Sequence, residues 1–484
     1  MKDYKYLPKE DRKKILLICD DIRVHSGVAT VAHQIVKKTC QHFNWVQIAG
    51  AINHPDKGKK LLLDDEMSKA TGVEDTSVLL YPVDGYSNAS FVRQVIEHEK
   101  PDAVMLFTDP RYFSFIFAIE NEIRKQIPII YLNIWDDYPA PLYNKEFYES
   151  CDLLFGISKQ TVNINNIVLG DKAVDKIIKY LPHGLDPTNY KPTSEYSDVE
   201  SKELNEMKKH FFKNDEVDFC LFFNSRNIRR KQIPDTIWAF RMFLDSLPKE
   251  KADKCRFLLH TELVSEAGTD LNAVTELFFG DGKYPKAIIF DTQRWDVEKL
   301  RHLYNMTDCQ ILLTSNEGWG LTITEGILSG NPIIANVTGG MQDQMRFVDD
   351  KGKWFTPTPE LPSNHTGKYK EHGEWAFPVY PSSRSIQGSP ATPYIFDDRC
   401  NATDAADRIR EVYDLGPDKR KEIGLKGRKW AMSDEAQFTA NHQGKTFIDT
   451  TDDLFKTWEP RVAFEVIDTD EKSTKRIQTH NLVY

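Results

Sequence analysis

The sequence predicts an α/β protein with two doubly wound domains, each built on a parallel sheet. Three features support this class. Short apolar runs alternate with helix-prone segments along residues 14–192 and again along 217–345. In both series, apolar runs are followed by a glycine-containing loop and then by a helix. This arrangement places ligands at the carboxyl ends of parallel strands. The charged segment 194–215 separates the two series and suits a connector, and 484 residues are enough for two or three domains.

Each series has its expected elements. In the first series, strands are expected at 14–19, 45–51, 77–81, 103–108 and 127–135, and helices at 27–39, 90–99 and 113–125. In the second, strands are expected at 217–223, 256–261, 287–290, 311–314 and 333–335, and helices at 234–244, 295–305, 322–328, 401–413, 418–432 and 438–458.

The amino-acid composition further limits the classes of protein to which the chain can belong. Hydrophobic residues make up 40% of the chain and charged residues 28%, as in globular proteins. No apolar run reaches 18 residues, and the start lacks the apolar centre of a signal peptide, so no transmembrane segment is expected. The seven cysteines are scattered without a CxxC pair, which favours buried thiols in a reducing compartment. We therefore expect a cytoplasmic protein. The net charge of −10 disfavours a protein whose main task is to bind nucleic acid.

The stretch 311–345 contains the most informative pattern. A buried strand is followed by the loop 316–320, with two glycines, and then by a helix. Glu317 and Glu325 can face one cleft there, where carboxylates accept hydrogen bonds from sugar hydroxyls but repel phosphates. Thr322 and Glu325 also fit a capping box, in which Glu325 would only satisfy the start of the helix.

The whole ordered pattern strongly resembles the donor-site signature of retaining GT-B glycosyltransferases of family 4, also called group 1. It consists of Glu317-Gly-Trp-Gly-Leu321, then Glu325, then Gly-Asn-Pro at 330–332 and the pair Gly339-Gly340. Thr322 stands where proline is usual. The resemblance implies two Rossmann-like domains whose parallel sheets face a central cleft. It also implies transfer of a sugar from a nucleotide diphosphate sugar, a UDP-sugar in the first place, to an acceptor hydroxyl.

The resemblance also implies roles for individual residues. Arg226 and Lys231, five apart after the strand at 217–223, would neutralise the leaving diphosphate in place of a metal, so no metal or other cofactor is expected. A surface cluster with Arg229 and Arg230 is the alternative. Glu325 would hold the ribose, and Glu317 with the backbone of 318–321 the transferred sugar. The expected catalytic set is Arg226, Lys231 and Glu317; the expected donor-binding set is Gly27, Arg226, Lys231, Gly318, Trp319, Gly320, Leu321, Thr322 and Glu325.

The same comparison divides the chain. Residues 1–195 would form an acceptor-side domain and 196–445 a donor-binding domain. The second includes 342–399, a long insertion rich in Pro and aromatic residues. Residues 446–484 would form a return helix and a polar tail.

The acceptor side is less determined. Thr108, Asp136 and Asp137 stand at the carboxyl ends of predicted strands and are the candidates to contact the acceptor, although the family often has a histidine where Trp135-Asp136 stands. His183 replaces a usual asparagine and is interpreted as structural. The acceptor could be a saccharide, a lipid-linked sugar, a protein or a hydroxymethylated DNA base.

Two other kinds of function stay open. One is a non-catalytic module that binds sugar nucleotides. The other is a phosphorylase or epimerase-type enzyme of the same fold, although phosphorylases of this architecture commonly use a pyridoxal phosphate lysine, for which no convincing site is found.

Overall fold

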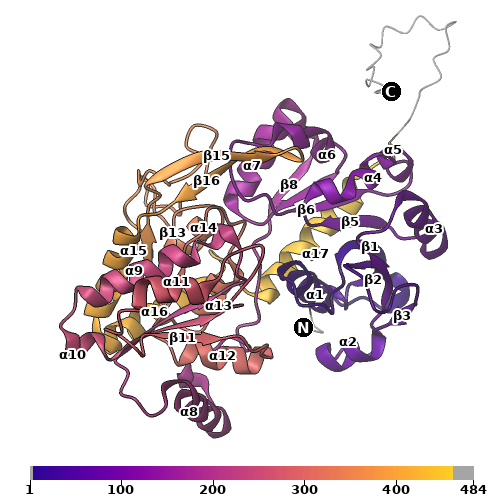
Figure 1. Ribbon diagram of the computed structural model, residues 1–484. Helices are drawn as coiled ribbons and strands as arrows, with labels where there is room; N and C mark the ends of the chain where they lie inside the picture. The colour runs from indigo at the N-terminus through magenta and orange to yellow at the C-terminus, as the bar shows by residue number, and fades with distance from the viewer. Residues whose placement is uncertain (1–3, 462–484) are drawn as a thin grey trace, which may run out of the picture.

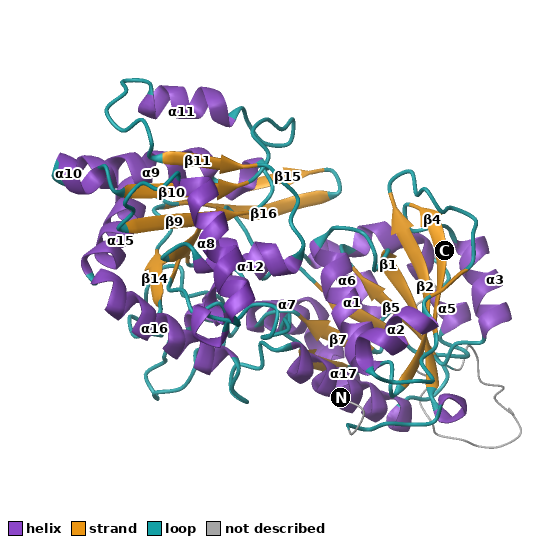
Figure 2. Ribbon diagram, turned by 90° about the horizontal axis from the view of Figure 1, so that it is seen from below, coloured by secondary structure: helices purple, strands orange, loops and turns teal. Residues whose placement is uncertain are grey.

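A computed structural model describes residues 4–461 of the chain. The chain forms two α/β domains side by side, the first drawn in purple and the second in magenta to orange (Figure 1). Helices lie on both faces of each sheet (Figure 2). Two parallel sheets with helical layers are the class that the alternation of apolar and helix-prone segments predicts, and this prediction is confirmed.

The first domain contains an eight-stranded sheet in the order β3-β4-β2-β1-β5-β6-β7-β8, in which only β3 is antiparallel. In β1, Ile15 and Leu17 belong to one apolar cluster and Leu16 and Ile18 to another, so both faces of the sheet are buried. The strands are β1 Lys13–Asp20, β2 Phe43–Ala51, β3 Leu61–Leu62, β4 Val78–Asp84, β5 Ala103–Phe107, β6 Ile129–Asn133, β7 Leu153–Gly156 and β8 Ile177–Tyr180.

Seven helices accompany this sheet within the described residues. They are α1 Gly27–Thr39, α2 Asp64–Thr71, α3 Ala89–Glu99, α4 Ser114–Phe117, α5 Glu120–Ile123, α6 Lys145–Glu149 and α7 Lys159–Leu169. The sequence predicts one helix over 113–125, whereas the chain there breaks into α4 and α5, because the backbone turns out of helical geometry between them.

The second domain contains a six-stranded parallel sheet in the order β11-β10-β9-β12-β13-β14. Its strands are β9 Phe219–Asn224, β10 Cys255–His260, β11 Ile288–Asp291, β12 Cys309–Leu312, β13 Ile333–Asn336 and β14 Ala376–Val379. Its helices are α8 Asp198–Phe212, α9 Ile233–Asp245, α10 Lys249–Ala252, α11 Leu271–Phe279, α12 Val297–Asn305, α13 Leu321–Leu328, α14 Met341–Met345, α15 Ala402–Asp414 and α16 Gly416–Ala431.

Both sheets reverse their winding direction next to their first strand. From β1 the chain adds β2 and β4 on one side and then crosses to β5 on the other; from β9 it adds β10 and β11 and then crosses to β12. At such a reversal, the loops after two neighbouring strands leave the sheet in opposite directions. A crevice that can hold a ligand opens between these two loops, at the carboxyl ends of the strands. The loops after β1 and β5 and after β9 and β12 therefore position the site.

The segment 342–399 is more regular than its composition indicates. It supplies α14, the edge strand β14, and a hairpin of β15 Ser383–Ser389 and β16 Thr392–Arg399. The sequence pattern missed β14 because Pro378 lies inside its short run, and a proline argues against a strand except at the edge of a sheet. It missed the hairpin because most residues of β15 and β16 are polar and partly exposed.

The last helix, α17 Ala440–Thr457, returns to the first domain and packs on α1. Phe447 of α17 stacks on Phe155 at 5.5 Å between ring centroids and lies beside Trp45. Gly444 permits the close approach, because a Cβ there would lie 2.7 Å from Cβ of Lys38. The polar tail expected after this helix lies mostly outside the described residues.

The seven cysteines are all free thiols and all buried, as the sequence predicts. Among the described residues, no helix combines the length and the apolar character needed to cross a bilayer.

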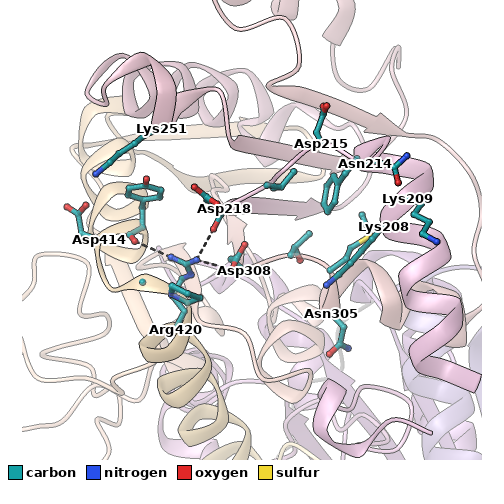
Figure 3. Close-up of a pocket in the computed structure, with 17 residues that line it drawn as sticks. Lys208, Lys209, Asn214, Asp215, Asp218, Lys251, Asn305, Asp308, Asp414 and Arg420 are labelled. Atoms are coloured by element: carbon teal, nitrogen blue, oxygen red, sulfur yellow. Dashed lines mark hydrogen bonds and ion pairs between the residues drawn. The ribbon is translucent and has the colours of Figure 1, made fainter. Parts of the chain in front are cut away.

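A cavity of about 810 Å³ lies at the amino ends of β9 and β12, at the edge of the second sheet opposite to the ligand crevice (Figure 3). Arg420 of α16 is buried behind it. Its guanidinium donates to the carbonyls of Tyr413 and Asp218 and to Oδ1 of Asp308, each at 3.1 Å. These bonds tie α15 and α16 to the start of the sheet, so we interpret the cavity as a structural junction.

We predict that Arg420→Ala destabilises the fold. Burial raises the pKa of Asp308, and removing Arg420 would leave that carboxylate without its cation. The free energy of unfolding should fall by about 2 kcal/mol. A carboxyl whose pKa is raised in the folded state favours folding when it is protonated, so the loss should be larger at about pH 7.5 than at about pH 5.

Urea unfolding at the two pH values measures this loss. Lys251→Ala is the matched control, because Lys251 lines the same cavity but is exposed and forms no ion pair within residues 4–461. Equal stability of Arg420→Ala and the native chain would show that the junction does not depend on this side chain.

Candidate active site

The two domains enclose a cleft of about 800 Å³ outside the carboxyl ends of their strands. Loops from both domains line it. In the first domain these are the loop after β1 and the ends of β5, β6 and β7; in the second they are the loops after β9, β10, β11 and β12. The cleft lies where the topology of the two sheets places a ligand site.

All but one of the residues expected to bind the donor line this cleft. They are Gly27, Arg226, Lys231, Gly318, Trp319, Gly320, Leu321 and Thr322, together with Glu317. Glu325 does not line it.

A buried ion cluster is the strongest electrostatic feature of the cleft. Oε2 of Glu317 accepts hydrogen bonds from Nζ of Lys231 and, at 2.8 Å, from Nη1 of Arg230. The side chains of Lys231 and Glu317 are 8% and 12% exposed. Arg230 also donates to the carbonyl of Asn316 at 2.6 Å, so the cluster fixes the loop after β12 to the loop after β9.

The cluster determines the ionisation of Glu317. Burial alone would raise the pKa of its carboxyl, but Lys231 and Arg230 together hold that pKa at about 2. Burial lowers the pKa of Lys231, and Glu317 opposes this shift. No protein group within the described residues donates to Oε1 of Glu317, so this oxygen is free to accept a hydrogen bond from a ligand.

Arg226 lies apart from the ion cluster. Its side chain lines the cleft, is exposed, and forms no ion pair or hydrogen bond within residues 4–461. It therefore carries a charge that no neighbouring carboxylate neutralises. Arg230, which the sequence assigned to a possible surface cluster, takes the position that touches Glu317.

The loop 316–320 depends on two glycines with left-handed backbone. Gly320 has φ 85° and caps α13, and Gly339 has φ 47° and packs against the loop. A Cβ at Gly339 would lie 1.7 Å from the carbonyl oxygen of Glu317, which no larger residue could accommodate. The two glycines thereby set the position of the backbone on either side of Gly318.

The amino ends of two helices meet across the cleft. Ser26 caps α1, its side chain accepting from Ala29 N at 3.0 Å, and donates to a carboxylate oxygen of Asp20. A Cβ at Gly27 would lie 3.5 Å from a methyl of Leu321, the first residue of α13. Free N–H groups of both first turns and both helix dipoles therefore favour an anion between them.

Glu325 is held by protein hydroxyls. Tyr190 donates to Oε1 at 3.0 Å, and Tyr304 donates to Oε2, which also accepts from Asn224 at 3.4 Å. The residue that caps α13 is Gly320, and no side chain caps it, so the capping box of Thr322 and Glu325 does not form. Asn224 separates Glu325 from the cleft, which it lines.

His183 lies in the cleft as a neutral ring. Burial lowers its pKa to about 3. Its ring meets Trp319 edge-on with centroids 6.1 Å apart, and Nδ1 has no hydrogen-bond partner. The sequence interpreted His183 as structural, and this interpretation stays a prediction; the unpartnered Nδ1 is buried.

The far end of the cleft carries a second group of polar side chains. Nδ1 of His260 lies 2.8 Å from Asp291, which also accepts from Nε1 of Trp295 at 2.6 Å. Gln293 and Arg294 line the cleft beside them. Sequence reasoning missed this group, although His260 and Asp291 each end a strand, and that position is the signal that could have found them.

The three acceptor-side candidates occupy different places. Asp136 lines the cleft, and burial raises its pKa to about 6, with Arg230 opposing the shift. Asp137 is buried, accepts from its neighbour Tyr138 N at 2.8 Å, and does not line the cleft. Thr108 does not line it either; its backbone, at φ 153°, turns the chain from β5 toward Asp109.

Among residues 4–461, no three His, Cys, Asp or Glu side chains are arranged to hold a metal ion.

Comparison with known proteins identifies the architecture. No protein-family model and no curated protein sequence matches the chain. Solved structures do match: a glycosyltransferase from Rickettsia africae superposes with a TM-score of 0.62 at 15% identity, over 92% of this chain and 100% of that one. The chain has the GT-B fold.

Two further GT-B structures match as closely. Anabaena HepE in complex with UDP and glucose gives a TM-score of 0.61 at 13% identity. Sucrose-phosphate synthase from Thermosynechococcus elongatus gives the same score and identity, and each covers 92% of this chain and 100% of its own. Similarity at this level of identity establishes the fold, including the two facing domains that form the cleft.

Proposed function

We propose that the protein is a retaining glycosyltransferase that moves a sugar from a nucleotide diphosphate sugar, a UDP-sugar in the first place, to an acceptor hydroxyl. The observation that carries this proposal is the anion site between two helix amino ends, with Lys231, Arg230 and Arg226 beside it. HepE, which shares the fold, is seen with UDP and glucose.

The charge of the site fits a nucleoside diphosphate. Lys231, Arg230 and Arg226 bring three positive charges, and the carboxyls of Glu317 and Asp136 face them. These cations and the two helix amino ends would stabilise the negative charge that develops on the leaving diphosphate. Glu317 fixes Lys231 and Arg230 before the ligand arrives, so these two cations would need little reorganisation during transfer.

Each part of the cleft has a place in this proposal. Oε1 of Glu317 and the backbone of 318–321 would hold hydroxyls of the transferred sugar, and the group around His260 would meet the nucleoside. Asp136, which faces the ion cluster from the first domain, would contact the acceptor hydroxyl. We assign no covalent nucleophile, because attack from the face that the diphosphate leaves needs none.

The cations would replace a divalent metal. We therefore predict that the protein turns over a UDP-sugar in the presence of EDTA. Release of UDP from a panel of UDP-hexoses and UDP-pentoses, with a pool of hydroxyl acceptors, measures this. Activity that EDTA abolishes and manganese or magnesium restores would contradict the metal-free proposal, and binding of UDP without turnover of any donor would indicate a binding module.

Arg226→Ala should weaken UDP binding without changing the fold. The side chain is exposed and unpaired, so its removal breaks no internal bond, while a charge-assisted contact to phosphate is worth about 2 kcal/mol, or roughly thirtyfold in Kd. Calorimetric titration with UDP measures the change. Arg229→Ala is the matched control, since Arg229 is an exposed neighbour outside the cleft; equal UDP affinity in both variants would remove Arg226 from the site.

We propose Glu325 as the ligand of the donor ribose, and its hydrogen bonds in the structure define how this proposal is tested. A ribose could reach its carboxylate only by displacing Asn224, whose bond to Oε2 is long at 3.4 Å. Glu325→Gln should weaken UDP binding several-fold, by about 1 kcal/mol, and should not change binding of 2′,3′-dideoxy-UDP. Equal losses for both ligands would show that Glu325 acts only through Tyr190 and Tyr304.

A further inference from the structure

A second cavity adjoins the donor cleft. It has a volume of about 410 Å³, within the range of small-molecule sites, and shares Ile134 and Asp136 with the main cleft. One wall is the loop after β5 in the first domain. The opposite wall is the tip of the β15–β16 hairpin, at Gln387–Ser389 and Thr392.

The base of this hairpin is fixed to the second domain. Asp398 N donates to the carbonyl of Ser315 at 2.9 Å, and Nε2 of Gln232 donates to the carbonyl of Asp398 at 2.8 Å. Asp398 is fully buried and accepts from Nη2 of Arg384 at 2.9 Å. These bonds hold the hairpin against the loops that carry Glu317 and Lys231.

Its middle is fixed to the first domain. Phe396 N donates to the carbonyl of Tyr138 at 2.7 Å. The hydroxyl of Tyr143 donates to the carbonyl of Tyr394 at 3.0 Å, and the two tyrosine rings meet edge-on at 4.9 Å. The hairpin therefore crosses the boundary between the domains.

The tip stays free of these anchors and faces the cavity. Gln387, Ser389 and Thr392 line it with an amide and two hydroxyl groups, of which Nε2 of Gln387 donates to Ser385 and Oγ of Ser389 accepts from Thr392 N, each at 3.2 Å. Ile134, Trp135 and Ile395 give the cavity an apolar floor. An apolar floor with converging amide and hydroxyl groups suits a ligand that has both C–H faces and hydroxyls.

The charges of the cavity disfavour an anionic ligand. Arg111 is the only cation among its lining residues, and Asp109 neutralises it through two bonds, Nε to Oδ1 at 2.8 Å and Nη2 to Oδ2 at 2.6 Å. Asp136 adds a second carboxyl. No uncompensated positive charge remains for a phosphate.

We propose that this cavity is the acceptor subsite, that the insertion hairpin forms its specificity-determining wall, and that it takes a neutral sugar unit through Gln387 and Thr392. The inference rests on the proposed transferase function. It places the acceptor next to Asp136, at the junction with the donor cleft, so that an acceptor hydroxyl can reach the sugar held beside Glu317.

The test compares a double variant, Gln387→Ala with Thr392→Ala, with the control Ile386→Ala. Ile386 lies on the same strand, is 61% exposed and does not line the cavity. With the UDP-sugar that gives turnover, neutral mono- and disaccharides are assayed against their 6-phosphates and a DNA duplex containing hydroxymethylcytosine. The double variant should raise the KM of the best neutral sugar about tenfold, leaving kcat and the Kd for UDP unchanged, while Ile386→Ala should behave as the native chain.

Several results would overturn the inference: preference for the sugar phosphates, transfer only to the DNA, or an unchanged KM in the double variant. Saturation-transfer NMR with the same neutral sugars in the presence of UDP does not require turnover, and loss of the signal in the double variant is expected there too. If UDP does not bind at all, the proposed function fails; if UDP binds but no neutral sugar binds or reacts, only the acceptor subsite fails.

Discussion

The contact between Lys231 and Glu317 is the constraint on which the rest of the site depends. Lys231 is almost fully buried, and a buried ammonium without a partner would cost several kcal/mol, on the order of 3 or more. Glu317 and Arg230 therefore form one unit with it, and this unit joins the loops after β9 and β12 across the winding reversal of the second sheet. Gly339 follows from the same requirement, because a Cβ there would overlap the carbonyl oxygen of Glu317, and Gly320 supplies the left-handed backbone at the end of the loop.

The fold and much of the cleft could be predicted because their signals are local. Alternating apolar runs and helix-prone segments indicate a doubly wound sheet wherever they occur. The signature from Glu317 to Leu321 is contiguous, so its residues necessarily reach the cleft together. The predicted position of β1, at 14–19, differs from the observed Lys13–Asp20 only at its ends.

What could not be predicted depends on contacts between distant segments. Which of four basic residues at 226–231 meets Glu317 is decided by the turn at 229–231, which orients Arg230 and Lys231 inward and leaves Arg226 open. The partners of Glu325, Tyr190 and Tyr304, lie 135 and 21 residues away along the chain. The hairpin could not be predicted for the same reason. Its polar strands are held by hydrogen bonds to Ser315, Gln232 and Tyr138 rather than by a periodic apolar face.

The anchoring of the β15–β16 hairpin to both domains has a kinetic consequence. A wall that is bonded to the first domain at Tyr138 and to the second at Ser315 keeps its shape only while the two domains hold their present separation. If the domains opened about a hinge to release product, the hydrogen bonds of the hairpin to one of the two domains would have to break. The hairpin would then no longer form a wall of the cavity. Under the proposed function, an acceptor too large for the cavity would push the two domains apart and misalign the donor, so the exclusion of oversized acceptors would appear in the rate of transfer.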